Sequence, residues 1–114
     1  MLAVIFEVWP TVEGKEEYLK IATELREFLV NREGFISIER FQSLSEEGKI
    51  LSLSFWHDEA AIEKWRNLPE HRDAQKRGKE SLFDSYRIRV AKVVRDYTES
   101  DRSGVPSDSI NALA

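Results

Sequence analysis

The stretch FISIERFQSLSEEGKILSLSFWHDEAAIEKWRNLPEH, residues 35–71, decides the fold. It predicts two apolar strands joined by a polar turn and followed by a helix, over residues 35–42, 50–56 and 58–68. Asp58 is well placed to cap the start of that helix. The helix carries Trp65, and His71 follows six residues later. Two strands therefore lead directly into a helix that displays an indole and then an imidazole.

The flanking segments complete the pattern. An apolar strand stopped by Pro10, an amphipathic helix, a polar helix and a last strand are expected at residues 2–9, 15–32, 70–82 and 86–97. The resulting order, β-α-β-β-α-β, predicts an α+β, ferredoxin-like fold with a four-stranded antiparallel sheet and the helices on one face. Gly34 and Gly48 are expected to take positive φ, at the end of the first helix and in the hairpin turn. We expect the domain at residues 1–97 and a polar C-terminal tail at residues 98–114.

Both faces of the predicted sheet carry bulky apolar side chains. In the first strand one face has Leu2, Val4, Phe6 and Val8, and the other has Ala3, Ile5 and Trp9. A single subunit with helices on one face would expose a large apolar patch on the other. A two-fold homodimer in which the two sheets meet, a dimeric αβ barrel, would cover that patch. The alternative is that the tail covers it.

Composition excludes several classes of function. The 114 residues carry a net charge of −4 and no basic stripe, so nucleic-acid binding is not expected. The absence of cysteine excludes disulfides, thiol catalysis and thiolate metal sites. His57 and His71 lack metal-ligand spacing, and no glycine-rich phosphate loop is present. The apolar start, residues 1–10, is too short to span a membrane, so a cytoplasmic protein without a membrane partner is expected.

Several short motifs resemble a known family. They are Ile5 to Pro10, Gly34 to Ser37, Leu53 to Trp56 before Asp58 to Ala61, and Trp65 followed by His71. With these features the chain resembles the antibiotic biosynthesis monooxygenase (ABM) domain family over roughly residues 2–97. The resemblance implies the dimeric αβ barrel. Some members oxidise polycyclic phenols or quinols with molecular oxygen and no metal or flavin, others bind and degrade haem, and many have no assigned activity, so the family fixes architecture better than chemistry.

Trp65 and His71 are the candidate catalytic residues. The resemblance implies that Trp65 lines a cavity between helices and sheet, where an indole offers a flat apolar wall and one N–H donor. The alternative, compatible with this role, is that Trp65 is a core residue. His71 stands where the cofactor-free members carry a polar aromatic residue, and a neutral imidazole there would accept a phenolic proton. The alternative is a surface or capping histidine.

Two positions depart from the family pattern. Ala61 stands where the cofactor-free members have an amide four residues before the tryptophan, and it has no side-chain donor. Gln75 stands where the haem-degrading members have the iron-binding histidine. The predicted substrate contacts are otherwise mostly core aromatics and one arginine: Phe6, Phe41, Trp56, Ala61 and Arg87.

Charged residues interrupt the predicted strands and leave alternatives open. Glu7 and Arg40 are expected to form an ion pair within the sheet or across the dimer, or else one of them enters the pocket, because an unpaired charge facing a core is costly. Arg87 and Arg89 share one face of the last strand, where they would hold an anionic ligand group or form part of a salt-bridged surface.

The sequence therefore predicts an ABM-type monooxygenase that oxidises a small electron-rich aromatic, a phenol or quinol, with no cofactor and no metal. The alternatives are a non-catalytic dimeric binding or stress-related protein of the same fold, and haem binding or degradation. The expected partners are a second copy of the chain and a small aromatic ligand.

Overall fold

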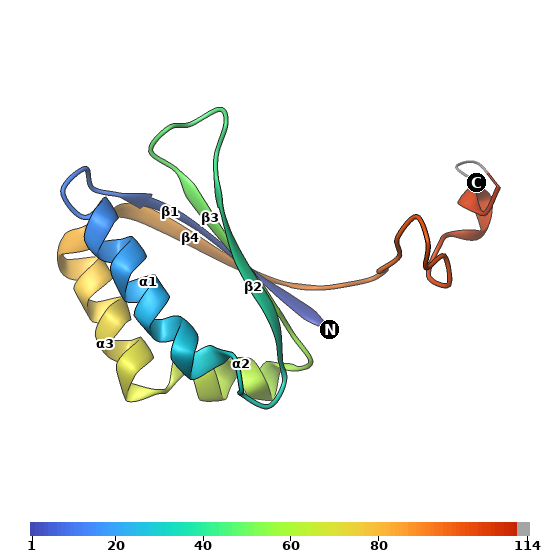
Figure 1. Ribbon diagram of the computed structural model, residues 1–114, viewed down its shortest axis with the longest axis horizontal. Coiled ribbons are helices and arrows are strands. Elements are labelled where there is room, and N and C mark those ends of the chain that lie inside the picture. Colours follow the sequence, from blue (N-terminus) through green and yellow to red (C-terminus); the bar gives the residue numbers. More distant parts are fainter. Residues whose placement is uncertain (112–114) are drawn as a thin grey trace.

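The structure, a computed structural model, describes residues 1–111 and has the predicted α+β, ferredoxin-like architecture (Figure 1). In chain order its elements are β1 (Leu2–Pro10), α1 (Lys15–Leu29), β2 (Phe35–Gln42), β3 (Ile50–Trp56), α2 (Glu59–Arg66), α3 (Pro69–Arg77), a π-helical turn (Gly78–Leu82), β4 (Phe83–Lys92) and a short 3-10 turn (Ser107–Ser109). The antiparallel sheet has the strand order β2-β3-β1-β4. The helices α1, α2 and α3 lie on one side of it (Figure 1).

Strand register assigns each side chain to one of the two faces. Leu2 pairs with Trp56 and Val8 with Ile50, so alternate residues of β1 and β3 face the helices together. The most buried residues of these two strands on the helix-facing side are Val8, Ile50, Ser52, Ser54 and Trp56. The other face, which we call the open face, carries the intervening residues of each strand. The two-faced pattern predicted for the sheet is therefore confirmed.

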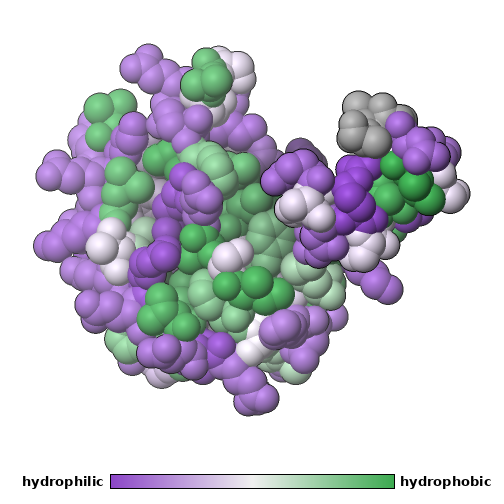
Figure 2. Space-filling view, turned by 45° about the vertical axis from the view of Figure 1, so that its right-hand side comes forward, coloured by the Kyte–Doolittle hydropathy of each residue, from purple (hydrophilic) through white to green (hydrophobic). Residues whose placement is uncertain are grey.

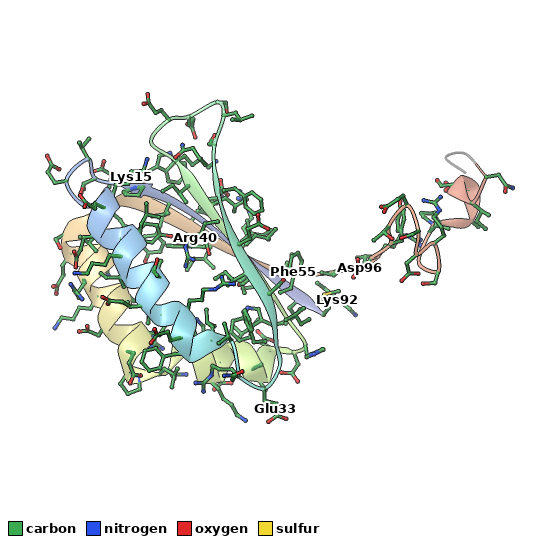
Figure 3. All side chains as sticks on the ribbon, in the orientation of Figure 1. Lys15, Glu33, Arg40, Phe55, Lys92 and Asp96 are labelled. Atoms are coloured by element: carbon green, nitrogen blue, oxygen red, sulfur yellow. The ribbon has the colours of Figure 1, made fainter. Side chains whose placement is uncertain are left out.

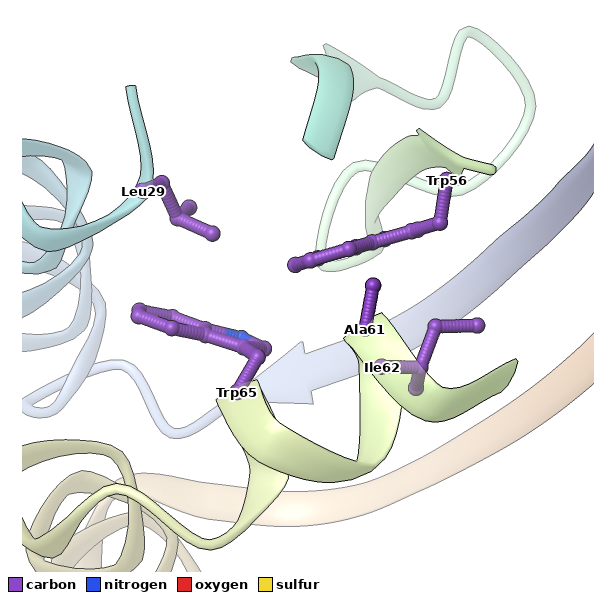
Figure 4. Packing of buried hydrophobic residues seen from close by; sticks show 5 residues of the cluster. All are labelled: Leu29, Trp56, Ala61, Ile62 and Trp65. Carbon is purple, nitrogen blue, oxygen red and sulfur yellow. The ribbon is translucent and has the colours of Figure 1, made fainter. Parts of the chain in front are cut away.

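The core on the helix-facing side is divided into two clusters. One joins α2 to the lower end of the sheet through Leu29, Trp56, Ala61, Ile62 and Trp65 (Figure 4). The other packs Tyr18 of α1 against Val8 and Ile50 at the opposite end. Burying such side chains supplies about 1.5–3 kcal/mol each. The first cluster fixes α2 at one end of the sheet, and α1 contributes Leu29 to the first cluster and Tyr18 to the second. On β3 the two small polar residues Ser52 and Ser54 separate the clusters.

Local signals explain how α2 begins. The Ala61 N–H donates to Asp58 Oδ1 at 2.9 Å, so Asp58 is the N-cap, as predicted.

Gly34 has φ 84°, as predicted, and a Cβ there would lie 2.5 Å from the Ala61 Cβ. It lies just before β2 rather than at the end of α1, which stops at Leu29. The prediction of positive φ for Gly48 is wrong, since Gly34 alone has it among the described glycines.

The last strand and the tail differ from the prediction. β4 begins earlier and ends at Lys92, after which only the Val93 N–H reaches the sheet, bonding the Met1 carbonyl at 3.0 Å. The chain beyond it runs away from the domain (Figure 1). The radius of gyration of 16.5 Å exceeds the roughly 13 Å typical of a compact chain of this length. Within the described residues the tail therefore does not cover the open face, and that alternative is wrong.

Candidate functional site

The break between α2 and α3 brings Trp65 and His71 into contact. Pro69 begins α3 directly after α2, and His71 falls in its first turn. The two rings lie 4.7 Å apart between centroids at an interplanar angle of 44°. Trp65 also faces Trp56, with ring centroids 6.5 Å apart (Figure 4). The indole of Trp65 is therefore in contact with both a buried tryptophan and an imidazole.

The surroundings of His71 favour its neutral form. Burial lowers the pKa of His71 below its ordinary value of 6.5, and the nearby positive charge of Arg72 lowers it further. The His71 Nδ1 lies 3.5 Å from the Arg66 carbonyl oxygen, a contact that acts in the opposite direction. When Nδ1 carries the proton toward that oxygen, Nε2 keeps a free lone pair. At neutral pH the imidazole is thus available as a proton acceptor.

The two tryptophans differ in their hydrogen bonding. The Trp56 indole N–H donates to Ser54 Oγ at 3.0 Å, and the residue is only 2% exposed. Trp56 is therefore a fixed wall of the core. Among the described residues no hydrogen bond uses the indole N–H of Trp65. Trp65 keeps a donor that a bound oxygen atom would satisfy.

A second group of polar side chains lies on the helix-facing side of the sheet, with three members on β2 and β3 and one on α1. We call Tyr18, Arg40, Ser52 and Ser54 the polar seam. Arg40 pairs with Ser52 across β2 and β3 and points toward α1 (Figure 3). The Arg40 Nε and the Tyr18 hydroxyl are both buried without a hydrogen-bond partner. Sequence reasoning raised Arg40 only as a residue that pairs with Glu7 or enters the pocket, and it did not single out the Tyr18 hydroxyl.

The predicted ion pair between Glu7 and Arg40 within the sheet is wrong, because the two residues lie on opposite faces of the sheet. Glu7 faces the open side, where Lys49 Nζ lies 2.6 Å from one carboxylate oxygen and Arg89 bonds the other. These two cations lower the pKa of Glu7, with Lys49 acting most strongly. The salt-bridged sheet surface predicted around Arg89 is thereby present.

The predicted substrate contacts fall on both faces. Phe6, Trp56 and Ala61 lie on the helix-facing side with Trp65. Phe41 is opposite Leu51 and Arg87 is opposite Glu7, so both belong to the open face. The structure therefore brings Trp56 and Ala61 together around Trp65. Phe6 packs instead against the second core cluster, and Phe41 and Arg87 are separated from both on the open face.

Solvent reaches the helix-facing side of the sheet over β4. Tyr86, Ile88 and Val90 pair with Val8, Phe6 and Val4, yet each of these β4 residues is about half exposed. This apolar flank is separated from the strand residues of the polar seam by β1. A separate groove of roughly 190 Å³ lies between α1 and α3, and three carboxylates, those of Glu24, Glu70 and Asp73, border it. Neither Trp65 nor His71 lines that groove.

Residues 1–111 contain neither a cluster of metal-binding side chains nor a helix that could cross a membrane. No group of three or more histidine, cysteine or carboxylate side chains is placed to hold a metal ion there. Among the helices of these residues, none combines the length and the apolar character needed to cross a membrane.

Comparison with known proteins identifies relatives over most of the chain. The family model for antibiotic biosynthesis monooxygenases matches residues 1–77. Jasmonate monooxygenase ABM of Pyricularia oryzae is 45% identical over 93 residues, which are 82% of this chain and 43% of the fungal protein. The chain thus spans less than half the length of that relative. The uncharacterized protein YqjZ of Bacillus subtilis is 31% identical over 93 residues, 82% of this chain and 79% of that protein.

Solved structures share the fold at low sequence identity. Rv0793 of Mycobacterium tuberculosis superposes with a TM-score of 0.76 at 14% identity, covering 85% of this chain and 98% of the other. A candidate antibiotic biosynthesis monooxygenase of Deinococcus radiodurans gives a TM-score of 0.77 at 14% identity, covering 86% and 97%. These likenesses confirm the ferredoxin-like architecture.

Proposed function

The chain belongs to the antibiotic biosynthesis monooxygenase family, and from that membership we propose that it oxygenates a small organic molecule bound beside Trp65. The observation that carries the proposal is the contact between Trp65 and a partly buried, neutral His71. An apolar wall and a proton acceptor at its edge are the two groups needed to activate a phenol toward oxygen.

The proposed reaction needs only the substrate and molecular oxygen. Nε2 of His71 accepts the phenolic proton, which leaves an electron-rich phenolate packed against Trp65. Oxygen then adds to a ring carbon, and loss of water from the adduct gives the quinone. One phenol and one O₂ yield one quinone and one water, so no external reductant is consumed. The His71 proton is returned when water leaves.

Oxygen uptake by the metal-free protein tests this proposal. We expect a panel of hydroquinones and phenols to raise uptake above the buffer rate. His71→Ala should lower that rate by about a hundredfold or more, because a positioned general base contributes about 10²–10⁴. The matched control is His57→Ala, which removes an exposed histidine outside the Trp65 contact and should keep the wild-type rate. Uptake equal to buffer with every substrate, unchanged in His71→Ala, would contradict the proposal.

A second candidate function is non-catalytic binding of a similar molecule. It is favoured by Ala61, which is 8% exposed in the core and offers no donor beside Trp65. Gln75, at the position of the haem ligand, accepts a hydrogen bond from Arg72 at 3.1 Å, which supports neither iron ligation nor haem degradation. Saturable ligand binding without oxygen uptake would support this candidate over the monooxygenase.

We also propose that two copies associate through their open faces. Ile5, Leu53 and Phe55 lie there beside the partly exposed Phe41. Figure 2, which turns the side away from α1 toward the viewer, displays apolar side chains gathered within a polar frame. An apolar surface of this kind is typical of an interface between subunits.

A further inference from the structure

We infer that the polar seam binds the carboxylate of the ligand, with Arg40 and Tyr18 as the anchoring residues. The class of substrate would then be a monocarboxylic acid whose ring lies beside Trp65. This inference rests on the proposed function, because that function places the ring there.

The first step is the state of the two donors. Tyr18 is 7% exposed, and its hydroxyl is buried without a hydrogen-bond partner. The Arg40 Nε is also buried without a hydrogen-bond partner. Buried donors in folded proteins nearly always have a hydrogen-bond partner, because a donor without one loses its bonds to water and gains none in return. Two unpaired donors on one side of the sheet therefore indicate a position for an acceptor from outside the chain.

The second step is the charge of that acceptor. No carboxylate of the described residues pairs with Arg40. Glu7 is held on the open face by Lys49 and Arg89, and Glu39 alternates to the open face as well. A guanidinium without a counter-ion presents donors that match a carboxylate in a bidentate geometry. An anionic group is thus the acceptor that best completes the seam.

The third step is the distance between the seam and the tryptophans. Ser52, which pairs with Arg40, and Trp56, which faces Trp65, are four residues apart on β3. At about 3.3 Å per residue their Cα atoms are roughly 13 Å apart. The helix-facing residues of β1 along this path, Val4 and Phe6, are apolar. A ligand that reaches both ends has an acid at one end, a ring at the other and an apolar middle.

The fungal relative fits this class, because jasmonate, the compound in its name, is a carboxylate. The name of the relative and the geometry of Arg40 and Tyr18 are independent, and both indicate a carboxylate.

Calorimetric titration with two matched probes tests the inference on the full chain. The probes are 4-phenylbutanoate and its neutral counterpart 4-phenylbutanamide. We expect the wild type to bind the acid at least about tenfold more tightly, since a hydrogen bond to a charged group in a buried site is worth that ratio or more. Arg40→Met should reduce the ratio of acid affinity to amide affinity to within about twofold. Arg40→Lys should keep part of the preference.

Tyr18→Phe provides a second test that does not depend on Arg40→Met folding. It removes only the hydroxyl, and we expect the acid preference to fall by about threefold to tenfold. Arg95→Met, which removes one positive charge from the exposed tail, is the matched control and should keep the wild-type ratio. Loss of the preference in Arg87→Met on the open face, rather than in Arg40→Met, would overturn the assignment.

Equal binding of acid and amide by the wild type, or no binding of either, would also overturn the inference. Its failure is separable from failure of the proposed function, because binding is measured without turnover. A protein that selects the acid but consumes no oxygen retains this inference and loses the proposed chemistry. A protein that consumes oxygen with phenols but shows no acid preference retains the proposed chemistry and loses this inference.

Discussion

At the scale of single residues, the neutral state of His71 links the candidate site to folding stability. Its pKa is lowered in the folded protein, so below about pH 6.5 the unfolded chain binds a proton more readily than the folded one. The free energy of unfolding should therefore fall as pH drops below that value, and this contribution levels off once pH is below the folded pKa. We expect urea denaturation between pH 7.5 and 5.5 to show a larger loss for the wild type than for His71→Gln. Parallel losses would show that His71 is not held neutral.

The Tyr18 hydroxyl gives a second prediction at this scale. The hydroxyl is buried without a hydrogen-bond partner, so its removal breaks no hydrogen bond and removes a buried polar group that is unpaired. The packing of the ring on Phe83 stays intact. We expect Tyr18→Phe to change the free energy of unfolding by between zero and about 1 kcal/mol, in the stabilising direction. The control is Tyr86→Phe, at a half-exposed tyrosine. A loss above about 1 kcal/mol would mean that the hydroxyl is paired within the fold.

Sequence reasoning located some of these residues and not others, for physical reasons. Trp65 and His71 are singled out by their spacing and the family resemblance, and a local break at Pro69 brings their rings into contact. Side chains alternate between the two faces of a strand, so the face on which Arg40 lies depends on the register of β2. A shift of one residue would move Arg40 to the other face. Tyr18 follows helical periodicity as a core residue, so its unpaired hydroxyl becomes visible only once its neighbours are known.

At the scale of elements, α2 carries Trp65, so the start of this helix should control the site. Asp58→Ala removes the acceptor for the Ala61 N–H and should cost about 1 kcal/mol in the free energy of unfolding. Asp58→Asn keeps a side-chain oxygen at the cap and is the matched control. Thermal denaturation of the two variants measures the difference. Equal stability of Asp58→Ala and the wild type would show that packing alone positions α2.

Element types were predictable from the sequence, whereas some boundaries were not. The strands 35–42 and 50–56 lie where their alternation placed them. The strand-forming side chains Val93, Val94 and Tyr97 favour a last strand that continues to residue 97. A strand also needs a neighbour, however, and β1 begins at Leu2, so only Val93 finds a partner beyond Lys92.

At the scale of the whole molecule, the open face predicts a dimer. Leu53→Glu would place a carboxylate among apolar neighbours and should shift the protein to a monomer. Sedimentation velocity should give twice the chain mass of 13.3 kDa for the wild type and the single mass for the variant. Val12→Glu, at a loop residue that is 93% exposed, is the control and should remain a dimer. A wild type that sediments as a single chain would contradict the association through the open faces.

The central claim is that the helix-facing side of the sheet binds the ligand, and the tryptophans report it. Trp56 and Trp65 lie on that side, whereas Trp9 lies on the open face with Lys49 Nζ 5.0 Å from its ring centroid. The three indole N–H signals can be followed by NMR during titration with 4-phenylbutanoate and assigned with single Trp→Phe variants. We predict that the Trp65 signal shifts most, Trp56 less, and Trp9 stays in place. A shift of Trp9 with Trp65 unmoved would contradict the account.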